Sequence, residues 1–442
     1  MSELLIKGCD ALSFSNGKAE ILSRQDILVQ GNKIEAVGQT DSLAVNPEIE
    51  VIDAAGLLAV PGFINTHAHT PMVLFRNLAE DVSQKDWFNE YIWPMESNLT
   101  EEDVYWGMLL GIAEMIEGGV TSVADHYFYV DQIAKVVESS GIRANLVWAV
   151  FGHEGEKKLD ETVEFVRRWQ NGAGGRITTW LGPHAPYTCP PDFLKMAAEK
   201  AAKNNVGIHT HVSETENQVI LSLKEHGLTP VQVLKETGVL DVPTILAHCL
   251  HPREEDYKLL AEADTGITQA PRTYMKHGDG LAPILRYRQE GIPLGLATDG
   301  AASNNTLDIM EQMRLMAMFV KYREADPTVM PLSEVVDIAF RGSAKVFRYE
   351  NRLGEIKAGM LADIALIRQD GLHMAPKSNP LAALVYCARA SDVDTVLCDG
   401  RVLMRGRRLL TIDKEEVKKE VQARLKRLSQ RVPNKRIAFY PT

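Results

Sequence analysis

Long apolar segments are missing from this sequence of 442 residues. No stretch approaches the roughly 18 consecutive apolar residues that a membrane-spanning helix requires, and the opening MSELLIKGCD lacks the apolar core of a signal peptide. We therefore expect a cytoplasmic protein without a membrane partner. Basic residues are also outnumbered: 48 Lys and Arg against 59 Asp and Glu give a formal net charge of −11, which argues against nucleic acid as the partner.

Cysteine is scarce as well. The five cysteines are odd in number, lie far apart and form no Cys-x-x-Cys pair, which argues against a disulfide framework and a thiolate zinc finger. The remaining composition, 45% hydrophobic and 24% charged, is typical of globular proteins and excludes a disordered or coiled-coil chain. A chain of this length can hold a barrel of about 250 residues and an accessory module.

Short strand-like segments separated by turns occur at both ends of the chain. Up to residue 57 they read LLIKGCDAL, AEILSRQDILVQ and KIEAVG, and near the other end they read GEIKAGMLADIALI and DTVLCDGRVLMRGRRLLT. A charged amphipathic helix is expected over residues 413–431. We interpret residues 1–57 and 355–442 as one composite β-sandwich domain with a C-terminal helix.

Between these ends, residues 58–354 alternate apolar strand-like runs with longer helical segments. The runs are LLAVPGFINTH, GVTSVADHY, RANLVWAVF, RITTWLGPH, VGIHTHV, PTILAHC, TGITQAP and IPLGLATDG. Apolar strands that alternate with amphipathic helices are typical of a buried parallel sheet. Eight such units predict an α/β fold in which a (β/α)₈ TIM-type barrel forms the catalytic domain.

Reactive residues gather at the ends of these runs, where the active site of such a barrel forms. They are His67, His69, His209, His211, His248 and Asp299. Because side chains two positions apart on a strand point to the same side, His67 and His69 can bind one ion. We choose His211 rather than His209 as the next ligand because it lies nearer the strand end, and we expect His209 to pack. With Asp299, this set suits zinc or iron(II) and leaves a position for water.

Glu214 and His248 are candidate catalytic residues beside that ion. Glu214 follows His211 by three residues, where its carboxylate can reach the water and a substrate heteroatom and act as a proton shuttle. His248 can hydrogen-bond the water or the developing charge, and Asp299 can accept the proton of the water. The fourth and fifth runs contain no lysine that would bridge a second ion, so we expect one divalent ion. Such a site suits attack of water on an electron-poor aromatic carbon with loss of an amine.

Five segments carry a family resemblance: PGFINTHAHTPMVLFRNLAED, LGPHAPYTCP, HTHVSET, LAHC and ATDGAASNN. They resemble the cytosine and adenosine deaminase-like branch of the amidohydrolase superfamily, and are most similar to the 5-methylthioadenosine/S-adenosylhomocysteine deaminase family. The resemblance covers nearly the whole chain and implies the same four metal ligands. It implies one divalent ion, with zinc expected and iron(II) as the alternative. It also implies that Glu214 and His248 form the catalytic pair.

The resemblance further implies three substrate-binding residues besides Glu214. His184 of LGPHAPYTCP matches a histidine that contacts the substrate, while Trp87 and Glu96 of DWFNEYIWPMES match residues that contact the purine and the ribose hydroxyls. The chemistry agrees, because a carboxylate can accept two hydrogen bonds from a vicinal diol and an indole can cover an apolar ring face. Each residue also has a structural alternative. Trp87 could anchor a loop, Glu96 could pair with a surface cation, and His184 could hold other residues of the site in place.

Two segments depart from the family pattern and bear on the substrate. Where members often carry an arginine suited to a substrate carboxylate, the third run has Trp148, and Arg272–Lys276 replaces a Ser-Asn-Met-Lys run after the seventh. Loss of a cation weakens binding of S-adenosylhomocysteine more than that of methylthioadenosine or adenosine.

These features predict a metal-dependent hydrolase that acts on carbon–nitrogen bonds in cyclic amidines. The first hypothesis is deamination of adenine nucleosides (5′-methylthioadenosine, S-adenosylhomocysteine or adenosine) to the inosine analogue and ammonia. The alternative is an aminohydrolase or chlorohydrolase of another nitrogen heterocycle, such as a triazine, guanine or a pterin. A non-catalytic barrel is a third hypothesis, which the complete set of ligands disfavours. The partner is then a small molecule, and the resemblance implies a homo-oligomer, either a dimer or a tetramer.

Overall fold

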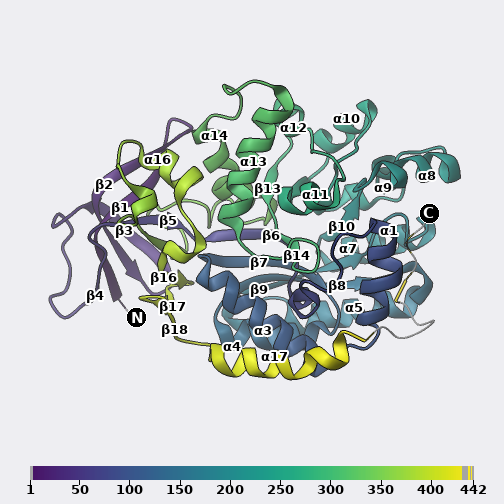
Figure 1. Ribbon diagram of the computed structural model, residues 1–442, viewed down its shortest axis with the longest axis horizontal. Helices are drawn as coiled ribbons and strands as arrows, with labels where there is room; N and C mark the ends of the chain where they lie inside the picture. The colour runs from purple at the N-terminus through teal and green to yellow at the C-terminus, as the bar shows by residue number, and fades with distance from the viewer. Residues whose placement is uncertain (1–2, 431–436, 439, 441–442) are drawn as a thin grey trace.

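The computed structural model describes residues 3–430, 437–438 and 440, which form two sheets of nine strands each (Figure 1). One sheet is parallel and is surrounded by helices, and the other is a mixed sheet built from both ends of the chain. This arrangement confirms the predicted α/β fold, with a barrel and a separate terminal β module. In the described ranges, none of the helices has the length and apolar character that crossing a membrane requires.

The parallel sheet forms the barrel. In spatial order its strands are β13 (Leu294–Leu296), β12 (Thr265–Gln269), β11 (Thr244–His248), β10 (Ile208–Val212), β9 (Ile177–Pro183), β8 (Arg143–Val150), β7 (Val120–Tyr127), β6 (Phe63–His69) and β14 (Asp299–Gly300). The eighth predicted strand is divided into β13 and β14. Because β13 pairs with β12 and β14 pairs with β6, this divided strand closes the ring.

Helices cover the outer face of the barrel (Figure 1). The longer ones are α3 (Glu101–Glu117), α4 (Val130–Ser140), α5 (Gly155–Trp169), α7 (Pro191–Asn204), α8 (Glu216–His226), α10 (Glu254–Glu262) and α13 (Ile309–Glu324). The shorter ones include α9 (Pro230–Glu236), α11 (Pro271–His277), α12 (Ile284–Gln289), α14 (Leu332–Asp337) and α15 (Ser343–Val346). Helix α3 begins after Thr100, because Thr100 and Asp103 form a capping box.

An insertion between β6 and α3 supplies part of the candidate site described below. It consists of η1 (Thr70–Phe75), α1 (Gln84–Asp86), η2 (Trp87–Ile92) and α2 (Trp93–Glu96). The segment η2 is a π-helical turn between two α-helical turns. Such turns are frequent at functional sites because they shift the direction of the side chains that follow.

The mixed sheet joins the two ends of the chain. Its strands are β18 (Arg408–Leu409), β17 (Arg401–Arg405), β16 (Val393–Cys398), β15 (Ile364–Arg368), β5 (Leu57–Pro61), β1 (Glu3–Ser15), β2 (Lys18–Gln30) and β3 (Lys33–Gln39), with β4 (Glu50–Asp53) paired to β1. The sheet encloses a hydrophobic core of its own, which includes Ile6, Ile27 and Leu397.

The first predicted barrel strand proved to be two strands. The sequence run from Leu57 to His67 is continuous and apolar, but β5 pairs with β15 of the mixed sheet and only β6 enters the barrel. The chain passes between the sheets at Gly62, where a Cβ atom would lie 2.2 Å from Thr121 Oγ1. Only glycine fits this close passage.

The domain division into 1–57 with 355–442 and 58–354 stays a prediction. Of the predicted terminal domain, residues 1–2, 431–436, 439 and 441–442 lie outside the described residues.

The predicted helix over 413–431 corresponds to α17 (Lys414–Leu428). It runs along α3, away from the mixed sheet (Figure 1). After α17, the carbonyl oxygen of Gln430 accepts a hydrogen bond of 2.6 Å from Nδ2 of Asn98, a residue that follows the insertion.

Candidate active site

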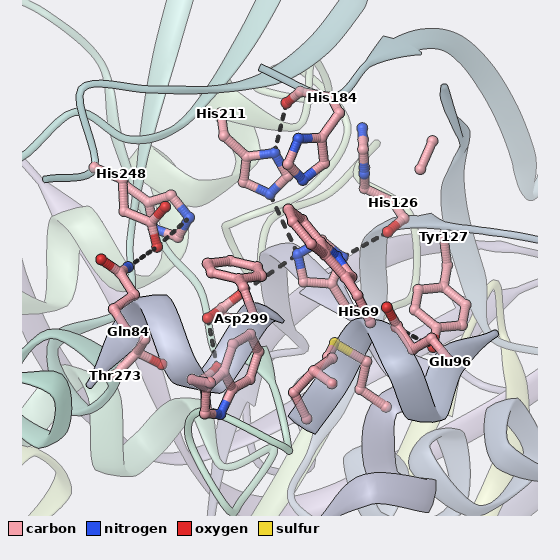
Figure 2. Close-up of a pocket in the computed structure, with 18 of the residues that line it drawn as sticks. His69, Gln84, Glu96, His126, Tyr127, His184, His211, His248, Thr273 and Asp299 are labelled. Atoms are coloured by element: carbon pink, nitrogen blue, oxygen red, sulfur yellow. Dashed lines mark hydrogen bonds and ion pairs between the residues drawn. The ribbon is translucent and has the colours of Figure 1, made fainter. Parts of the chain in front are cut away.

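The strand ends bring the predicted metal ligands together at one end of the barrel (Figure 2). The possible ligand atoms of His67, His69 and His211 all lie within 4.8 Å of one another, and so do those of His67, His248 and Asp299. Asp299 Oδ1 lies 3.6 Å from His67 Nε2 and 3.4 Å from His69 Nε2. Strands β6, β10, β11 and β14 thus contribute side chains to one cluster. We call this group the imidazole cluster; it consists of His67, His69, His211, His248 and Asp299.

Hydrogen bonds outside the cluster orient its rings. The Nδ1 atom of His69 lies 2.6 Å from the His126 carbonyl oxygen, and that of His211 lies 2.7 Å from the His184 carbonyl oxygen. A carbonyl can only accept, so Nδ1 carries the proton in both rings and the Nε2 lone pair faces the cluster. Burial, together with the neighbouring imidazoles, keeps the pKa of His211 well below its usual value, so the ring is neutral and can bind a metal.

His67 supplies the strongest sign of a bound cation. Its Nδ1 atom lies 2.8 Å from His209 Nε2, while its Nε2 atom is buried and has no hydrogen-bond partner within the described part of the chain. An unpartnered nitrogen that faces two imidazoles and a carboxylate is costly unless a further group binds there. The residues therefore fit a divalent metal ion.

Asp299 is held so that one oxygen faces the cluster. Ser303 Oγ donates a 2.6 Å hydrogen bond to Oδ2, which leaves Oδ1 toward His67 and His69. Burial would raise the pKa of this carboxyl group, but its interactions with His67 and with the other imidazoles outweigh burial and keep the pKa well below the usual value. Asp299 and His248 have φ angles of 61° and 72°, a left-handed conformation that non-glycine residues rarely adopt outside functional sites.

Glu214 lies at the edge of the imidazole cluster. Its Oε1 atom is 3.9 Å from His248 Nε2 and accepts a 3.2 Å hydrogen bond from Gln84 Nε2, and its Oε2 atom accepts one of 3.2 Å from Gln218 Nε2 (Figure 2 shows Gln84). Burial, reinforced by the negative charge of Asp299, raises the pKa of Glu214 to about 8. A carboxyl group with a pKa near neutrality can both release and take up a proton.

A cavity opens beside the cluster and contains the predicted substrate-binding residues. Its empty space, including the open mouth, is about 670 Å³. Trp87 and Glu96 from the insertion and His184 after β9 all line it, as do Glu214 and His248. Aromatic side chains form much of the remaining wall; they are Phe88, Trp93, Phe128, Phe151 and Tyr187.

Glu96 and Trp87 both present polar groups to this cavity. Glu96 is buried; its Oε1 atom accepts a 2.6 Å hydrogen bond from Tyr127 Oη, and burial raises its pKa to about 8. Glu96 is thus not paired with a surface cation. The Trp87 Nε1 donor is buried and has no partner among the described residues. His184 Nδ1 lies 2.9 Å from Thr188 Oγ1, and burial with His69 and His248 lowers the pKa of His184 to about 3.

Trp148, the departure from the family pattern in the third run, has its side chain outside the cavity. Its ring packs near Phe165 and lies under Lys158 Nζ at 4.2 Å. Because side chains alternate along β8, Ala149 faces the cavity instead. Further positions that sequence reasoning missed are Gln84 and Gln218, which belong to no motif.

The Arg272–Lys276 segment forms part of α11 and keeps its cations out of the cavity. Arg272 pairs with Glu311 at 2.5 Å, and Lys276 pairs with Glu80 at 2.7 Å. From this segment Thr273 lines the cavity.

Comparison with known proteins identifies the family. The sequence pattern of the Amidohydrolase family matches residues 58–403. The chain belongs to the amidohydrolase family. This confirms the expected resemblance and the prediction of a metal-dependent hydrolase that acts on carbon–nitrogen bonds. The amidohydrolase is 42% identical over 410 residues to a protein of Desulforudis audaxviator named 5-methylthioadenosine/S-adenosylhomocysteine deaminase, covering 92% of this chain and 95% of the relative.

Further relatives have the same name or the same fold. The protein of that name from Pelotomaculum thermopropionicum is 40% identical over 98% of this amidohydrolase and 100% of its own length. An adenosine deaminase from Xanthomonas campestris with bound zinc matches with a TM-score of 0.92 and 26% identity, over 97% of this chain and 98% of the other. A zinc-bound atrazine chlorohydrolase from Arthrobacter aurescens matches with a TM-score of 0.86 and 26% identity, over 96% and 100%.

Proposed function

We propose that this amidohydrolase deaminates adenine nucleosides to the inosine analogue and ammonia, with 5′-methylthioadenosine, S-adenosylhomocysteine and adenosine as candidate substrates. One observation carries the proposal: the buried carboxyl group of Glu96 lines the same cavity as Glu214 and the imidazole cluster. A nucleoside has a diol at one end and a reactive ring carbon at the other, so it suits both groups. The names of the relatives support the same substrate class.

We propose that His67, His69, His211 and Asp299 hold one divalent ion, zinc, with iron(II) as the alternative. Three imidazole nitrogens and a carboxylate oxygen suit zinc, which is bound in the Xanthomonas adenosine deaminase. When bound, such an ion lowers the pKa of a water molecule and supplies a hydroxide nucleophile near neutral pH. Neither β9 nor β10 contains a lysine that would bridge a second ion, which supports one ion rather than two.

Glu214 is proposed to carry the proton to the substrate. Its raised pKa lets it hold a proton near neutral pH and deliver it to the ring nitrogen beside the carbon under attack. Asp299 accepts one proton of the attacking water and passes it to the departing amino group, which leaves as ammonia. The remaining proton on the new hydroxyl group returns to Glu214 as the carbonyl forms. His248 lies 3.9 Å from Glu214 and donates a hydrogen bond to the oxygen that attacks the ring carbon.

Recognition of the nucleoside falls to the other residues that line the cavity. The Glu96 carboxylate accepts hydrogen bonds from the two ribose hydroxyls, and the Trp87 indole N–H donates to the purine. The His184 ring is neutral and contacts the substrate between them. These roles follow from the family resemblance and are supported by the shared cavity.

We infer a preference for substrates whose 5′ substituent carries no charge. Of the residues in the described ranges that line the cavity, none is lysine or arginine. The carboxylate of S-adenosylhomocysteine would therefore lose its hydration without gaining an ion pair. The sulfur of 5′-methylthioadenosine can instead contact the aromatic wall formed by Phe128 and Phe151.

The alternative substrates are free heterocycles such as a triazine, guanine or a pterin. They lack the diol that Glu96 can bind, so the buried carboxyl group of Glu96 would be left without a ligand partner. The test is ammonia release from the zinc-loaded protein with adenosine, 5′-methylthioadenosine, S-adenosylhomocysteine, guanine and a triazine. We expect 5′-methylthioadenosine to give the highest kcat/KM. Faster turnover of guanine or the triazine would contradict the proposal and favour the alternative.

Three further assignments have support from the sequence alone. We propose a cytoplasmic homo-oligomer, either a dimer or a tetramer, and the two domains given above. Light scattering during gel filtration of the full chain measures the oligomeric state.

A further inference from the structure

A side chain from the far C-terminal segment lies behind the cavity. Tyr440 is only 4% exposed, and its ring stacks on Phe88 with the centroids 5.0 Å apart and the planes at 5°. The ring of Tyr187 also packs against the Tyr440 ring, with the two centroids 5.4 Å apart. Asn89 holds the backbone of Tyr440 at two points, since its Nδ2 atom donates to the carbonyl oxygen (3.1 Å) and its Oδ1 atom accepts from the amide (2.9 Å). The insertion therefore fixes the position of Tyr440.

The Tyr440 hydroxyl contacts both amides that bind Glu214. It donates to Gln84 Oε1 at 3.2 Å and accepts from Gln218 Nε2 at 3.5 Å, and it also lies 3.1 Å from the hydroxyl oxygen of Thr215. The same two glutamines donate 3.2 Å hydrogen bonds to the two carboxyl oxygens of Glu214. Each oxygen of Glu214 is thus joined to Tyr440 through one glutamine.

This linkage decides which edge of the Gln84 amide faces Glu214. An amide that rotates by half a turn exchanges its donor and its acceptor. While Tyr440 donates to Gln84 Oε1, the Nε2 atom has to face Glu214. Without the hydroxyl, Gln84 could rotate and place its oxygen against Glu214. Whenever Glu214 has given up its proton, the two acceptors would then repel each other. Tyr440 is absent from the residues found to line the cavity within the described ranges, so it acts without touching the substrate.

We propose that Tyr440 is a positioning residue of the active site: its hydroxyl keeps Gln84 donating to Glu214. Gln218 is fixed separately, because its Oε1 atom accepts a 3.0 Å hydrogen bond from the Glu214 amide. Tyr440 is then a working part of the site, although the sequence places it in the predicted terminal domain. This assignment rests on the proposed function, in which Glu214 moves a proton to the ring. Because the hydroxyl fixes a group that acts in the chemical step, its loss lowers kcat more than it changes substrate binding.

The test is Tyr440→Phe in the full-length, zinc-loaded enzyme, which keeps the ring stacked on Phe88 and removes only the hydroxyl. We expect kcat for 5′-methylthioadenosine to fall about tenfold, with KM changed by less than about twofold and zinc content unchanged. The matched control is Tyr322→Phe on α13, where the side chain is 85% exposed and far from this network. The control keeps the wild-type kcat.

A comparison in the Glu214→Gln background separates positioning from a structural role. If Tyr440 acts through Glu214, adding Tyr440→Phe to Glu214→Gln causes no further loss of the residual rate. An equal loss in both backgrounds, or a wild-type kcat for Tyr440→Phe, overturns the assignment of Tyr440 alone. A wild-type enzyme that releases no ammonia from any adenine nucleoside overturns the proposed function itself, and this assignment with it.

Discussion

The Nδ1 atom of His67 lies 2.8 Å from the Nε2 atom of His209, and both rings are fully buried. If His67 Nε2 presents a lone pair to a metal ion, its Nδ1 carries the proton and donates a hydrogen bond to His209 Nε2. His209 then fixes both the tautomer and the direction of a metal ligand. Partners of this kind tune metal affinity although they do not touch the ion.

Substituting His209 by alanine is therefore expected to weaken zinc binding by about 10–100-fold. His209→Gln should recover part of the affinity, because its Oε1 atom can accept the same hydrogen bond. Zinc retained during titration with a chelator measures the effect, and excess zinc should restore activity to the alanine variant. His226→Ala on α8, outside the cluster, is the matched control. Unchanged zinc affinity in His209→Ala would show that His209 only packs.

The sequence located the strand ends well but not the faces of the strands. Residues that end apolar runs in a barrel must meet at one edge, so the imidazole cluster could be predicted from spacing. In β8 almost every residue is buried on both sides, so the apolar pattern does not distinguish the face of Trp148 from that of Ala149. For the same reason the boundary between β5 and β6 is invisible within one apolar run.

The network around Glu214 could not be predicted at all. Gln84, Gln218 and Tyr440 are separated by up to 356 positions along the chain, and they meet only because the insertion, α8 and Tyr440 are packed together. A glutamine in a helix has no periodic signature, and its hydrogen bonds depend on tertiary structure alone.

The role of Glu96 can be tested with substrates that differ only in the ribose. For Glu96→Ala we expect kcat/KM for adenosine to fall about 100-fold, because the hydrogen bonds between the Glu96 carboxyl group and the two ribose hydroxyls are lost. The same variant should turn over 2′,3′-dideoxyadenosine at nearly the wild-type kcat/KM, because this compound has no diol. Initial rates of ammonia release for the two substrates give the comparison. An equal loss on both would show that Glu96 does not recognise the ribose.

The burial of Glu96 also predicts how stability depends on pH. Its pKa is about 8 in the folded chain, against an ordinary 4.5, so the folded state binds the proton more tightly than the unfolded state. Stability is therefore lost as the pH rises from about 4.5 to about 8 and is constant above that range. Glu96→Gln removes this titration, so its unfolding temperature should exceed that of the wild type at pH 8.5 and approach it at pH 5.

Thermal unfolding in matched buffers at the two pH values measures this difference. Glu255→Gln, an exposed residue of α10, should show no such dependence on pH. A difference between Glu96→Gln and the wild type that is the same at both pH values would mean that Glu96 does not change its protonation in this range.

Arg143, the first residue of β8, makes the barrel depend on the mixed sheet. Its side chain is 1% exposed, and its Nη2 atom lies 3.1 Å from Asp363 Oδ1 and 3.0 Å from Asp399 Oδ1. Removal of Arg143 would leave two carboxylates without their cation, and breaking a buried pair costs about 3–5 kcal/mol. We expect Arg143→Ala to lower the free energy of unfolding by that amount while KM stays unchanged, since Arg143 is not among the residues that line the cavity.

The control for this prediction is the pair formed by Arg168 and Asp131 at the surface. Nε and Nη2 of Arg168 donate to the two carboxylate oxygens of Asp131, as the same atoms of Arg143 do to Asp363. Both hydrogen bonds of Arg168 are 2.9 Å long, and the Arg168 side chain is 53% exposed. An exposed pair contributes only about 0–1 kcal/mol, so Arg168→Ala should change the denaturant midpoint little. If the two variants lost equal stability, burial would not be what makes the Arg143 contacts strong, and the two sheets would be held together by apolar packing instead.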